Sequence, residues 1–466
     1  MNKTTVLMIM LAAVLFCSTG QAADRESRKF YASQSGAALD SDVYKGGGTD
    51  DTAVLQAILD QAPRLGRLHL VLDGAALISK SLRIHSNTTI ECPDKSCGLF
   101  LADGSDCSVL RNANCDKDTI HDRNITILGG VYNNNSPGQV HTRMDRDLEP
   151  GISNCVFGMM FYGVENFLMR DVTIANQRTW ALFMVNWKHV TMENIHIDRR
   201  ERADHQNQDG LHFWGPGRFL TLKNIRGNSG DDFIALTPDE HDGKSSIEDV
   251  LIQGVHFEDV DQGIRLLSRG EGKLDRVIIR DVTGTYRSFG FGINPWHDGA
   301  GKPWGGKQGG TYGNIVFDTI DVRPMKNNYT YCQPFLFKLG GNIESMTFKN
   351  IYQHTPEFNH RMFIIGGGYT GDYPEIPEQP THINRLIIDG LYIDERCEQG
   401  IQDAYFLIRS KVDLLSIKDV ILRRRVGDDT KKGSLIRMEG GTLGELRLID
   451  ISADCLETIV ETIPGN

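Results

Sequence analysis

From about residue 124 to the C-terminus, the chain alternates apolar and polar residues in short segments separated by polar turns. These segments begin 23 to 42 residues apart, and many end in Asn-Ile or Asp-Val. A second short apolar segment follows within most of the repeating units. Alternation with a period of two predicts β-strands rather than helices, and its regular recurrence predicts a stack of structural repeats.

Two or three strands with turns in each repeat predict an all-β fold, a single-stranded right-handed parallel β-helix. A β-sandwich array and a propeller are the alternatives. A propeller blade needs four strands and about 40 residues or more, which few of these units supply. Within the β-helix we expect Asn224, Asp281, Asn350 and Asp419 to satisfy the backbone of turns at coil corners.

A helix is predicted close to the N-terminus. Leu55, Ile58 and Leu59 fall on one helical face, and Asp50 or Asp51 stands at the position of an N-cap. A solenoid exposes unpaired strand edges at its ends, so a helix over the first coil would protect that edge. The sequence therefore predicts an N-terminal capping helix.

Residues 1–23 are predicted to be a secretory signal peptide. Lys3 supplies the positive start, Val6–Phe16 the apolar stretch, and small residues follow at the cleavage position. A membrane anchor is the alternative, but this apolar run is too short to span a bilayer. We expect residues 24–466 to form one β-helix domain, with cap and first coils in 24–100, in a secreted or periplasmic protein.

Charge and cysteine content narrow the classes of partner. The formal net charge of −11 argues against nucleic acid, because phosphate binding requires a basic surface. No later segment is apolar enough to predict membrane insertion. Beyond the predicted signal peptide, Cys92 with Cys97 and Cys107 with Cys115 are close enough in sequence to form disulfides in an exported protein. The absence of a Cys-x-x-Cys spacing argues against structural zinc.

Three aspartates occur where strands of neighbouring repeats begin. Asp209 lies in the segment NQDG, and Asp231 and Asp232 follow 22 and 23 residues later in GDDFIAL. Equivalent positions of successive coils stack about 4.8 Å apart in a parallel β-helix. Aligning Asp209 with Asp231, and Leu211 with Phe233, brings the three carboxylates into one patch.

Carboxylates that are this close influence each other's ionisation. A neighbouring negative charge raises at least one pKa, so one acid keeps its proton while another is ionised. Glycoside hydrolysis uses such a pair. The alternative is that aspartates at corners only satisfy turns, although the repulsion within Asp231–Asp232 disfavours it. His212 is predicted to point outward from the strand beside these acids, as a candidate substrate contact.

The two aspartate segments resemble the NTDG and GDDCIA motifs of the polygalacturonase family, glycoside hydrolase family 28, within the pectin-lyase-like superfamily. A tryptophan in the preceding coil is matched by Trp180, and the similarity extends over most of Thr49–Arg287. The resemblance implies an inverting hydrolase. In it Asp231 would be the general acid, and Asp209 and Asp232 would activate the water.

The predicted substrate-binding residues are Asn207, His212, Arg265 and Trp180. The chain departs from the family in two respects. The family's His-Gly motif has no counterpart here, and the lysine that follows its Arg-Ile pair is absent, because Arg265 is followed by two leucines. In the family that lysine helps to hold a uronate carboxylate.

The sequence thus predicts a secreted glycoside hydrolase that acts on a polysaccharide or oligosaccharide, either pectin-like or another acidic or neutral glycan. No metal and no other cofactor is expected. One alternative is a polysaccharide lyase, in which the aspartates hold Ca²⁺ and Arg265 acts as the base. Another is a solenoid that binds glycans without catalysis.

Overall fold

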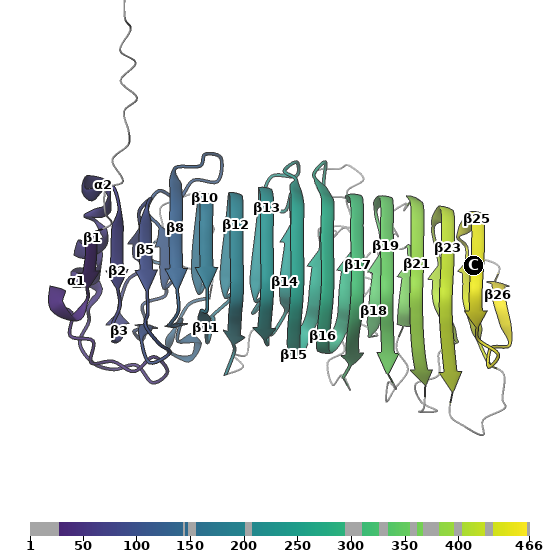
Figure 1. Cartoon of the computed structure of the whole chain (residues 1–466), viewed down its shortest axis with the longest axis horizontal. Helices are drawn as coiled ribbons and strands as arrows, with labels where there is room; N and C mark the ends of the chain where they lie inside the picture. The colour runs from purple at the N-terminus through teal and green to yellow at the C-terminus, as the bar shows by residue number, and fades with distance from the viewer. Residues whose placement is uncertain are drawn as a thin grey trace, which may run out of the picture.

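The strands form one long stack, with the helices at its N-terminal end (Figure 1). The computed structural model describes residues 28–142, 145–147, 155–200, 207–293, 310–325, 334–354, 361–366, 382–395, 403–424 and 432–463. The strand pairings in these ranges are parallel, and they form three ladders. The protein is a right-handed parallel β-helix, as the sequence predicted. The predicted signal peptide lies outside the described residues.

The first ladder extends from one end of the stack to the other. Its strands are β1 (Arg28–Tyr31), β2 (Leu68–Val71), β5 (Thr88–Glu91), β8 (Asp122–Leu128), β10 (Met159–Arg170), β12 (Leu182–Asp198), β13 (Leu211–Gly227), β15 (Ile247–Leu266), β16 (Lys273–Ile293), β17 (Thr311–Pro324), β19 (Asn342–His354), β21 (His382–Glu395), β23 (Lys411–Arg424) and β25 (Thr442–Ser452).

The second ladder begins with four short strands and continues in the C-terminal part of β12, β13 and the long strands from β17 onward, and in the middle of β15 and β16. These four are β3 (Ala75–Ile78), β6 (Gly98–Leu101), β9 (Val131–Asn133) and β11 (Thr173–Ala175). The third ladder joins the starts of β10, β12 and β13 and the ends of β15 and β16 to separate short strands. The short strands are β4 (Leu82–Ile84), β7 (Leu110–Asn112), β14 (Asp232–Thr237), β18 (Phe335–Leu339), β20 (Arg361–Ile365), β22 (Ala404–Ile408), β24 (Ser434–Glu439) and β26 (Thr458–Ile463).

The core fills the inside of the stack with inward-facing side chains in register. One row of the third ladder stacks Phe291, Phe337, Phe363 and Phe406, with ring centroids 4.7, 5.0 and 4.6 Å apart. These separations match the inter-strand spacing, because each coil contributes one ring at the same position. The alternating apolar pattern of the sequence corresponds to these inward rows.

The corners between the first and second ladders are formed by residues with left-handed backbone. Asn224, Asp281, Asn350 and Asp419 have φ of 54°, 58°, 52° and 55°, which confirms their prediction as corner residues. Asn and Asp tolerate this conformation better than other non-glycine residues. The Asn224 amide also donates a hydrogen bond of 3.0 Å to the side chain of Asn194 on the preceding coil. The corners therefore link successive coils as well as turn the chain.

The predicted capping helix is present as α1 (Thr52–Leu59), which buries Leu55, Ile58 and Leu59 against β2 and β4. The Asp50 carboxylate accepts the Thr52 N–H at 2.9 Å, while the N-cap residue Asp51 instead accepts the N–H of Leu39. A second short helix, α2 (Ala62–Leu65), and the 3₁₀ turns η1 (Ser33–Ser35) and η2 (Ser136–Gly138) complete the helical elements of the described ranges. None of the helices in these ranges has the length and hydropathy that crossing a bilayer requires.

The two disulfides that the spacing of the cysteines allowed are not formed. Cys92, Cys97, Cys107 and Cys115 are all free thiols. Cys92 and Cys107 are packed in the core, where burial raises the pKa of each thiol to about 12. Closeness in sequence therefore did not lead to pairing, because these side chains serve as apolar core residues.

The corner at Asn224 makes the first prediction. Asn224→Ala should lower the free energy of unfolding by about 2 kcal/mol, because it loses one hydrogen bond and puts a Cβ-restricted residue at positive φ. Asn224→Gly loses the bond without the steric cost and should retain about 1 kcal/mol more stability than the alanine variant. Urea unfolding measures both, with the exposed Lys223→Ala as a control. Equal losses in the two variants would contradict the backbone argument.

Candidate active site

The coil that carries GDDFIAL differs from its predicted register by one residue. β13 pairs Leu211 with Ile234, not with Phe233, so Asp209 lies beside Asp232 in the third ladder. Phe233 and Ile234 are both fully buried. Two adjacent core side chains interrupt the alternation at this corner, and for this reason the apolar pattern selected the wrong partner for Leu211.

The three aspartates nevertheless come together. Carboxylate oxygens of Asp209, Asp231 and Asp232 lie within 4.8 Å of one another. Asp209 and Asp232 are 2% and 4% exposed, whereas Asp231 is partly exposed. They line a pocket of about 170 Å³, called the carboxylate pocket below. The other lining residues are Trp180, Asn207, His212, Thr237, Glu240, Gln262, Arg265, Leu267 and Arg269.

All seven site residues predicted from the sequence therefore line one pocket. The same three aspartates are also a candidate cation site, because their oxygens converge closely enough to bind one ion together. Hard cations such as Ca²⁺ prefer carboxylate ligands of this type.

His212 points outward from β13, as predicted, but its ring is buried. Nδ1 lies 2.6 Å from the Asp209 carboxylate, and Nε2 lies 3.0 Å from the Thr237 hydroxyl and 3.3 Å from the Glu240 carboxylate. The Trp180 ring stacks on the imidazole with a centroid separation of 3.7 Å. Because both ring nitrogens already have partners, the geometry favours a role in orienting Asp209 over the predicted direct contact with substrate.

Trp180 and Asn207 form one wall of the carboxylate pocket. The Trp180 indole N–H donates to the Asn207 side-chain oxygen at 3.1 Å, and the ring is 8% exposed. Its stacking on His212 shields the imidazole from water. Trp180 is thus in place to hold the histidine, and Asn207 is the more accessible of the two side chains.

Arg265 belongs to β15 on the next coil, and its side chain lies beside the start of β14. Its Nε is 3.2 Å from the Asp232 carboxylate, and its terminal nitrogen donates to the Gln262 side chain at 2.5 Å. The guanidinium also lies over the ring of Phe289. Arg265 was predicted to bind substrate, and its contact with Asp232 adds a second role, compensation of the charge of that aspartate.

Glu240 and Arg269 were missed by the sequence analysis. They form an ion pair of 2.6 Å, and Glu240 also accepts the indole N–H of Trp214 at 3.0 Å. Asp239 holds the loop after β15 by accepting the backbone N–H of Arg269 at 2.7 Å. Glu240 follows the end of β14, and Arg269 follows the end of β15 on the next coil. Residues that follow stacked strands are neighbours, so aligning the ends of the strands, as well as their starts, would have predicted this contact.

Burial and charge set the ionisation of the aspartates. Burial, followed by the charges of Asp209 and Asp232, raises the pKa of Asp231 well above its usual value. Burial also raises the pKa of Asp232 to about 7, although Arg265 opposes it. For Asp209, burial raises the pKa and the hydrogen bond from His212 lowers it.

His212 and Glu240 shift in the directions expected of an ion pair. Burial would lower the pKa of His212, but its bonds to Asp209 and Glu240 raise it to about 9. Burial would raise the pKa of Glu240, but His212 and Arg269 lower it to about 2. At neutral pH the imidazole is therefore a cation, and it lies between Asp209 and the ionised Glu240.

The charges of the pocket balance if one carboxyl group stays protonated. Its described lining contains four acids, Asp209, Asp231, Asp232 and Glu240, and three bases, His212, Arg265 and Arg269. Each of the other three acids has a basic partner within 3.3 Å, and Asp231 has none among the residues that the structure describes. Charge balance and burial thus both place the proton on Asp231.

Comparison with known proteins identifies the fold class. No family model matches the chain, and no curated protein sequence matches it significantly. A double mutant of the tailspike protein of E. coli bacteriophage HK620 superposes with a TM-score of 0.60 and 12% identity over 90% of this chain and 75% of that one. The exopolygalacturonase of Thermotoga maritima gives 0.51 and 12%, over 93% and 92%.

The A-module of the mannuronan C-5 epimerase AlgE4 of Azotobacter vinelandii gives a TM-score of 0.50 at 10% identity, over 94% of this chain and 98% of that one. Identities this low establish a shared fold and not a shared activity. The protein has the parallel β-helix fold of these proteins, with a pocket lined by carboxyl groups on its third ladder.

The raised pKa of His212 generates a prediction about stability. A histidine with a folded-state pKa of about 9 stabilises the protein fully below the unfolded value of about 6.5, and this contribution is lost as the pH rises through about 9. His212→Gln cannot titrate. The free-energy difference between wild type and variant should shrink by on the order of 3 kcal/mol between pH 6 and pH 9.5.

Urea unfolding at a series of pH values measures this difference, and the exposed His121→Gln is the control. A difference that does not change with pH would show that His212 is not an imidazolium in the folded protein.

Proposed function

We propose that the protein is a glycoside hydrolase that acts on a polysaccharide or oligosaccharide. The observation that carries the proposal is the convergence of three carboxyl groups, because oxygens of Asp209, Asp231 and Asp232 lie within 4.8 Å of one another in one pocket. Burial and its two neighbours raise the pKa of Asp231 well above its usual value, which favours its protonated form. General acid and base catalysis of glycosidic bond hydrolysis requires such a pair. Another HK620 tailspike mutant, with a TM-score of 0.59 and 13% identity, was solved in complex with a pentasaccharide, which supports a glycan ligand for this fold.

Each aspartate has a distinct proposed role. Asp231 donates its proton to the departing glycosidic oxygen. Asp232, whose pKa of about 7 lies close to neutral pH, accepts a proton from the attacking water. Asp209 helps to orient that water and is itself held by His212. Arg265 is a positioning residue that stabilises the ionised form of Asp232.

The pocket accommodates the substrate's charge in a different way from the family that the sequence resembles. Leu267 stands where that family has its lysine, and it lines the pocket as an apolar group. Arg265 and Arg269 are engaged by Asp232 and Glu240. A uronate carboxylate would have to share these cations, so the proposal covers both acidic and neutral glycans.

The stereochemical course is a separate question. The resemblance implies inversion, whereas inverting pairs of carboxyl groups are usually about 6.5–9.5 Å apart. Carboxylate oxygens within 4.8 Å of one another are closer than that. The geometry by itself therefore does not support inversion, and the configuration of the first product must be measured.

We also propose that residues 1–23 direct export and that residues 24–466 form one domain in a secreted or periplasmic protein. The apolar start of the chain supports export, and a polymeric glycan is a substrate that a cell meets outside its membrane. The three ladders run through the described ranges from β1 to β26, in keeping with one domain.

A polysaccharide lyase is the second candidate, favoured by one observation. The converging oxygens of Asp209, Asp231 and Asp232 could hold Ca²⁺, which would supply the charge that neutralises a uronate. In this reading Arg265, which already contacts the cluster, would act as the base.

The two candidates predict different products. A screen of acidic and neutral glycans should yield new reducing ends without new ultraviolet absorbance, and EDTA should leave the rate unchanged. If unsaturated products form, and EDTA prevents their formation, the protein is a lyase and not a hydrolase. Proton NMR of the first product reads its anomeric configuration, and an unchanged configuration would exclude inversion. If no glycan yields a product, both enzymatic proposals fail and glycan binding without catalysis is the remaining function.

The role of Asp231 predicts the effect of its removal. Asp231→Asn keeps the shape of the side chain but cannot donate the proton, so turnover should fall about 10²-fold or more. The wild-type rate should fall as the pH rises through the pKa of Asp231. Asp209→Asn removes a neighbouring charge and should shift this alkaline limb to lower pH, but only in part, because burial is the larger cause of the raised pKa.

Full pH–rate profiles of both variants and the wild type make this test, with melting temperature as the folding control. Asp281→Asn, at an exposed corner outside the carboxylate pocket, is the matched substitution and should behave as wild type. Near-normal turnover by Asp231→Asn would sink the assignment of the acid.

A further inference from the structure

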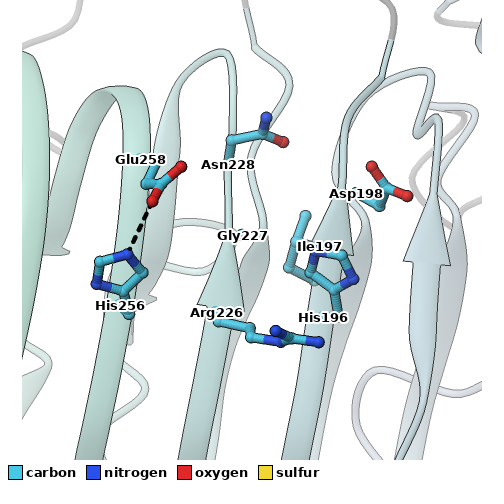
Figure 2. A pocket seen from close by; sticks show the side chains of 8 residues that line it. All are labelled: His196, Ile197, Asp198, Arg226, Gly227, Asn228, His256 and Glu258. Atoms are coloured by element: carbon cyan, nitrogen blue, oxygen red, sulfur yellow. Dashed lines mark hydrogen bonds and ion pairs between the residues drawn. The ribbon is translucent and has the colours of Figure 1, made fainter.

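A second charged hollow lies on the outer face of the second ladder. His196 of β12, Arg226 of β13 and His256 of β15 occupy one row of this ladder on three successive coils (Figure 2). Together with the adjoining strand ends they line a hollow of about 190 Å³, called the charged groove below. It shares no lining residue with the carboxylate pocket.

The acidic residues of the charged groove already have partners. Glu258 lies 3.1 Å from the Nε2 of His256, whose Nδ1 lies 2.8 Å from the Thr283 hydroxyl. Asp198 forms an ion pair of 2.8 Å with Arg200. Neither acid is therefore paired with Arg226.

Arg226 is exposed, and its guanidinium forms no hydrogen bond or ion pair within the part of the chain that the structure describes. Figure 2 shows it extending toward His196. Burial is the largest cause that lowers the pKa of His196. The negative charge of Asp198 opposes it, and the positive charges of Arg226, Lys95 and Arg200 add to it. Because Asp198 is paired with Arg200, the exposed guanidinium of Arg226 is the group at this end of the groove that would stabilise an anion.

The charged groove continues along the solenoid axis. A second hollow of about 530 Å³ shares His256 and Glu258 with it and reaches Arg323 on β17. Further along the same row, the rings of Tyr352 and Tyr392 stack at 5.2 Å. Between His256 and these tyrosines the row contains Thr283 and the acid Asp321. The basic groups thus lie at one end of the row and the aromatic rings at the other, at about 4.8 Å intervals, which suits a polymer along the axis with its anionic group at the Arg226 end.

We propose that the charged groove binds a stretch of an acidic polysaccharide, with Arg226 and His196 holding a carboxylate or sulfate group of the chain. A guanidinium offers parallel donors that match either anion. This goes beyond the proposed hydrolysis, because the groove would retain the polymer at a distance from the carboxylate pocket. The chain's net charge of −11 disfavours unspecific binding of polyanions, so retention of one reports a local site.

Affinity electrophoresis of the full chain tests the proposal. The gels contain polygalacturonate, which carries carboxylates, dextran sulfate, which carries sulfates, or uncharged dextran. All proteins carry Asp231→Asn to stop turnover. At least one acidic polymer should retard the protein, less so at high salt, and dextran should not. Whether polygalacturonate or dextran sulfate retards the protein identifies the anionic group.

Arg226→Gln should weaken this retention by about tenfold, the scale of one charge-assisted hydrogen bond. Arg226→Lys keeps the charge without the fork of donors and should lie between. Lys223→Gln, which removes the same charge from an exposed position on the same strand, should stay within about twofold of the parent protein. Melting temperatures show that the variants are folded.

Three results would each overturn the proposal. These are equal retention of the Arg226→Gln and Lys223→Gln proteins, retardation by dextran equal to that by the acidic polymers, and no retardation by either acidic polymer. The proposal about the charged groove and the proposal of hydrolysis can be tested independently. Arg226→Gln in the otherwise unchanged chain should leave turnover of a short oligosaccharide intact, whereas Asp231→Asn should lower turnover about 10²-fold or more and leave retention intact.

Discussion

Parallel hydrogen bonding between successive coils is the constraint on which the rest of this structure depends. It fixes each position of one coil about 4.8 Å from the equivalent position of the next. The row of stacked phenylalanines in the core, the linked side chains of Asn194 and Asn224 at the corners, and the row from His196 to Tyr392 on the outer face all follow from it. Residues about 20 to 40 positions apart in the chain thereby become immediate neighbours.

The carboxylate pocket shows what this stacking demands when the stacked residues are acidic. Buried carboxylates cost several kcal/mol each unless basic groups or hydrogen bonds compensate them. His212, Arg265 and Arg269 compensate three of the four acids, and the shielding ring of Trp180 keeps His212 in place. The fourth acid, Asp231, is left to keep its proton. The reactivity proposed for the pocket is thus a consequence of incomplete compensation.

Much of this could be predicted from the sequence, because a two-residue apolar period and corner residues at coil intervals are local signals. They predicted the β-helix and the meeting of the three aspartates, whereas a helical period predicted the cap with Leu55 inside it. Trp180 and Asn207 were predicted from the resemblance to a family, and both line the same pocket. The errors occurred where several residues compete for one place. Phe233 and Ile234 are both apolar and both buried, so alternation could not decide the register. The burial of His212 depends on the loop after β14, which brings Glu240 to its ring and carries no periodic signal. The pair of Glu240 with Arg269 follows from stacking of the strand ends, and the apolar period within the strands does not extend to those positions.

The carboxylate pocket draws its principal groups from only three adjoining coils, since Asp209 belongs to one, Asp231 and Asp232 to the next, and Arg265 to the third. The number of coils on either side of the pocket can consequently change during evolution without altering the pocket. Duplication or loss of a whole coil elsewhere would change the length of the molecule while every neighbour of the pocket stayed in place. In such an architecture the reach of the protein along a polymer and the chemistry that it performs can be inherited and modified as separate traits.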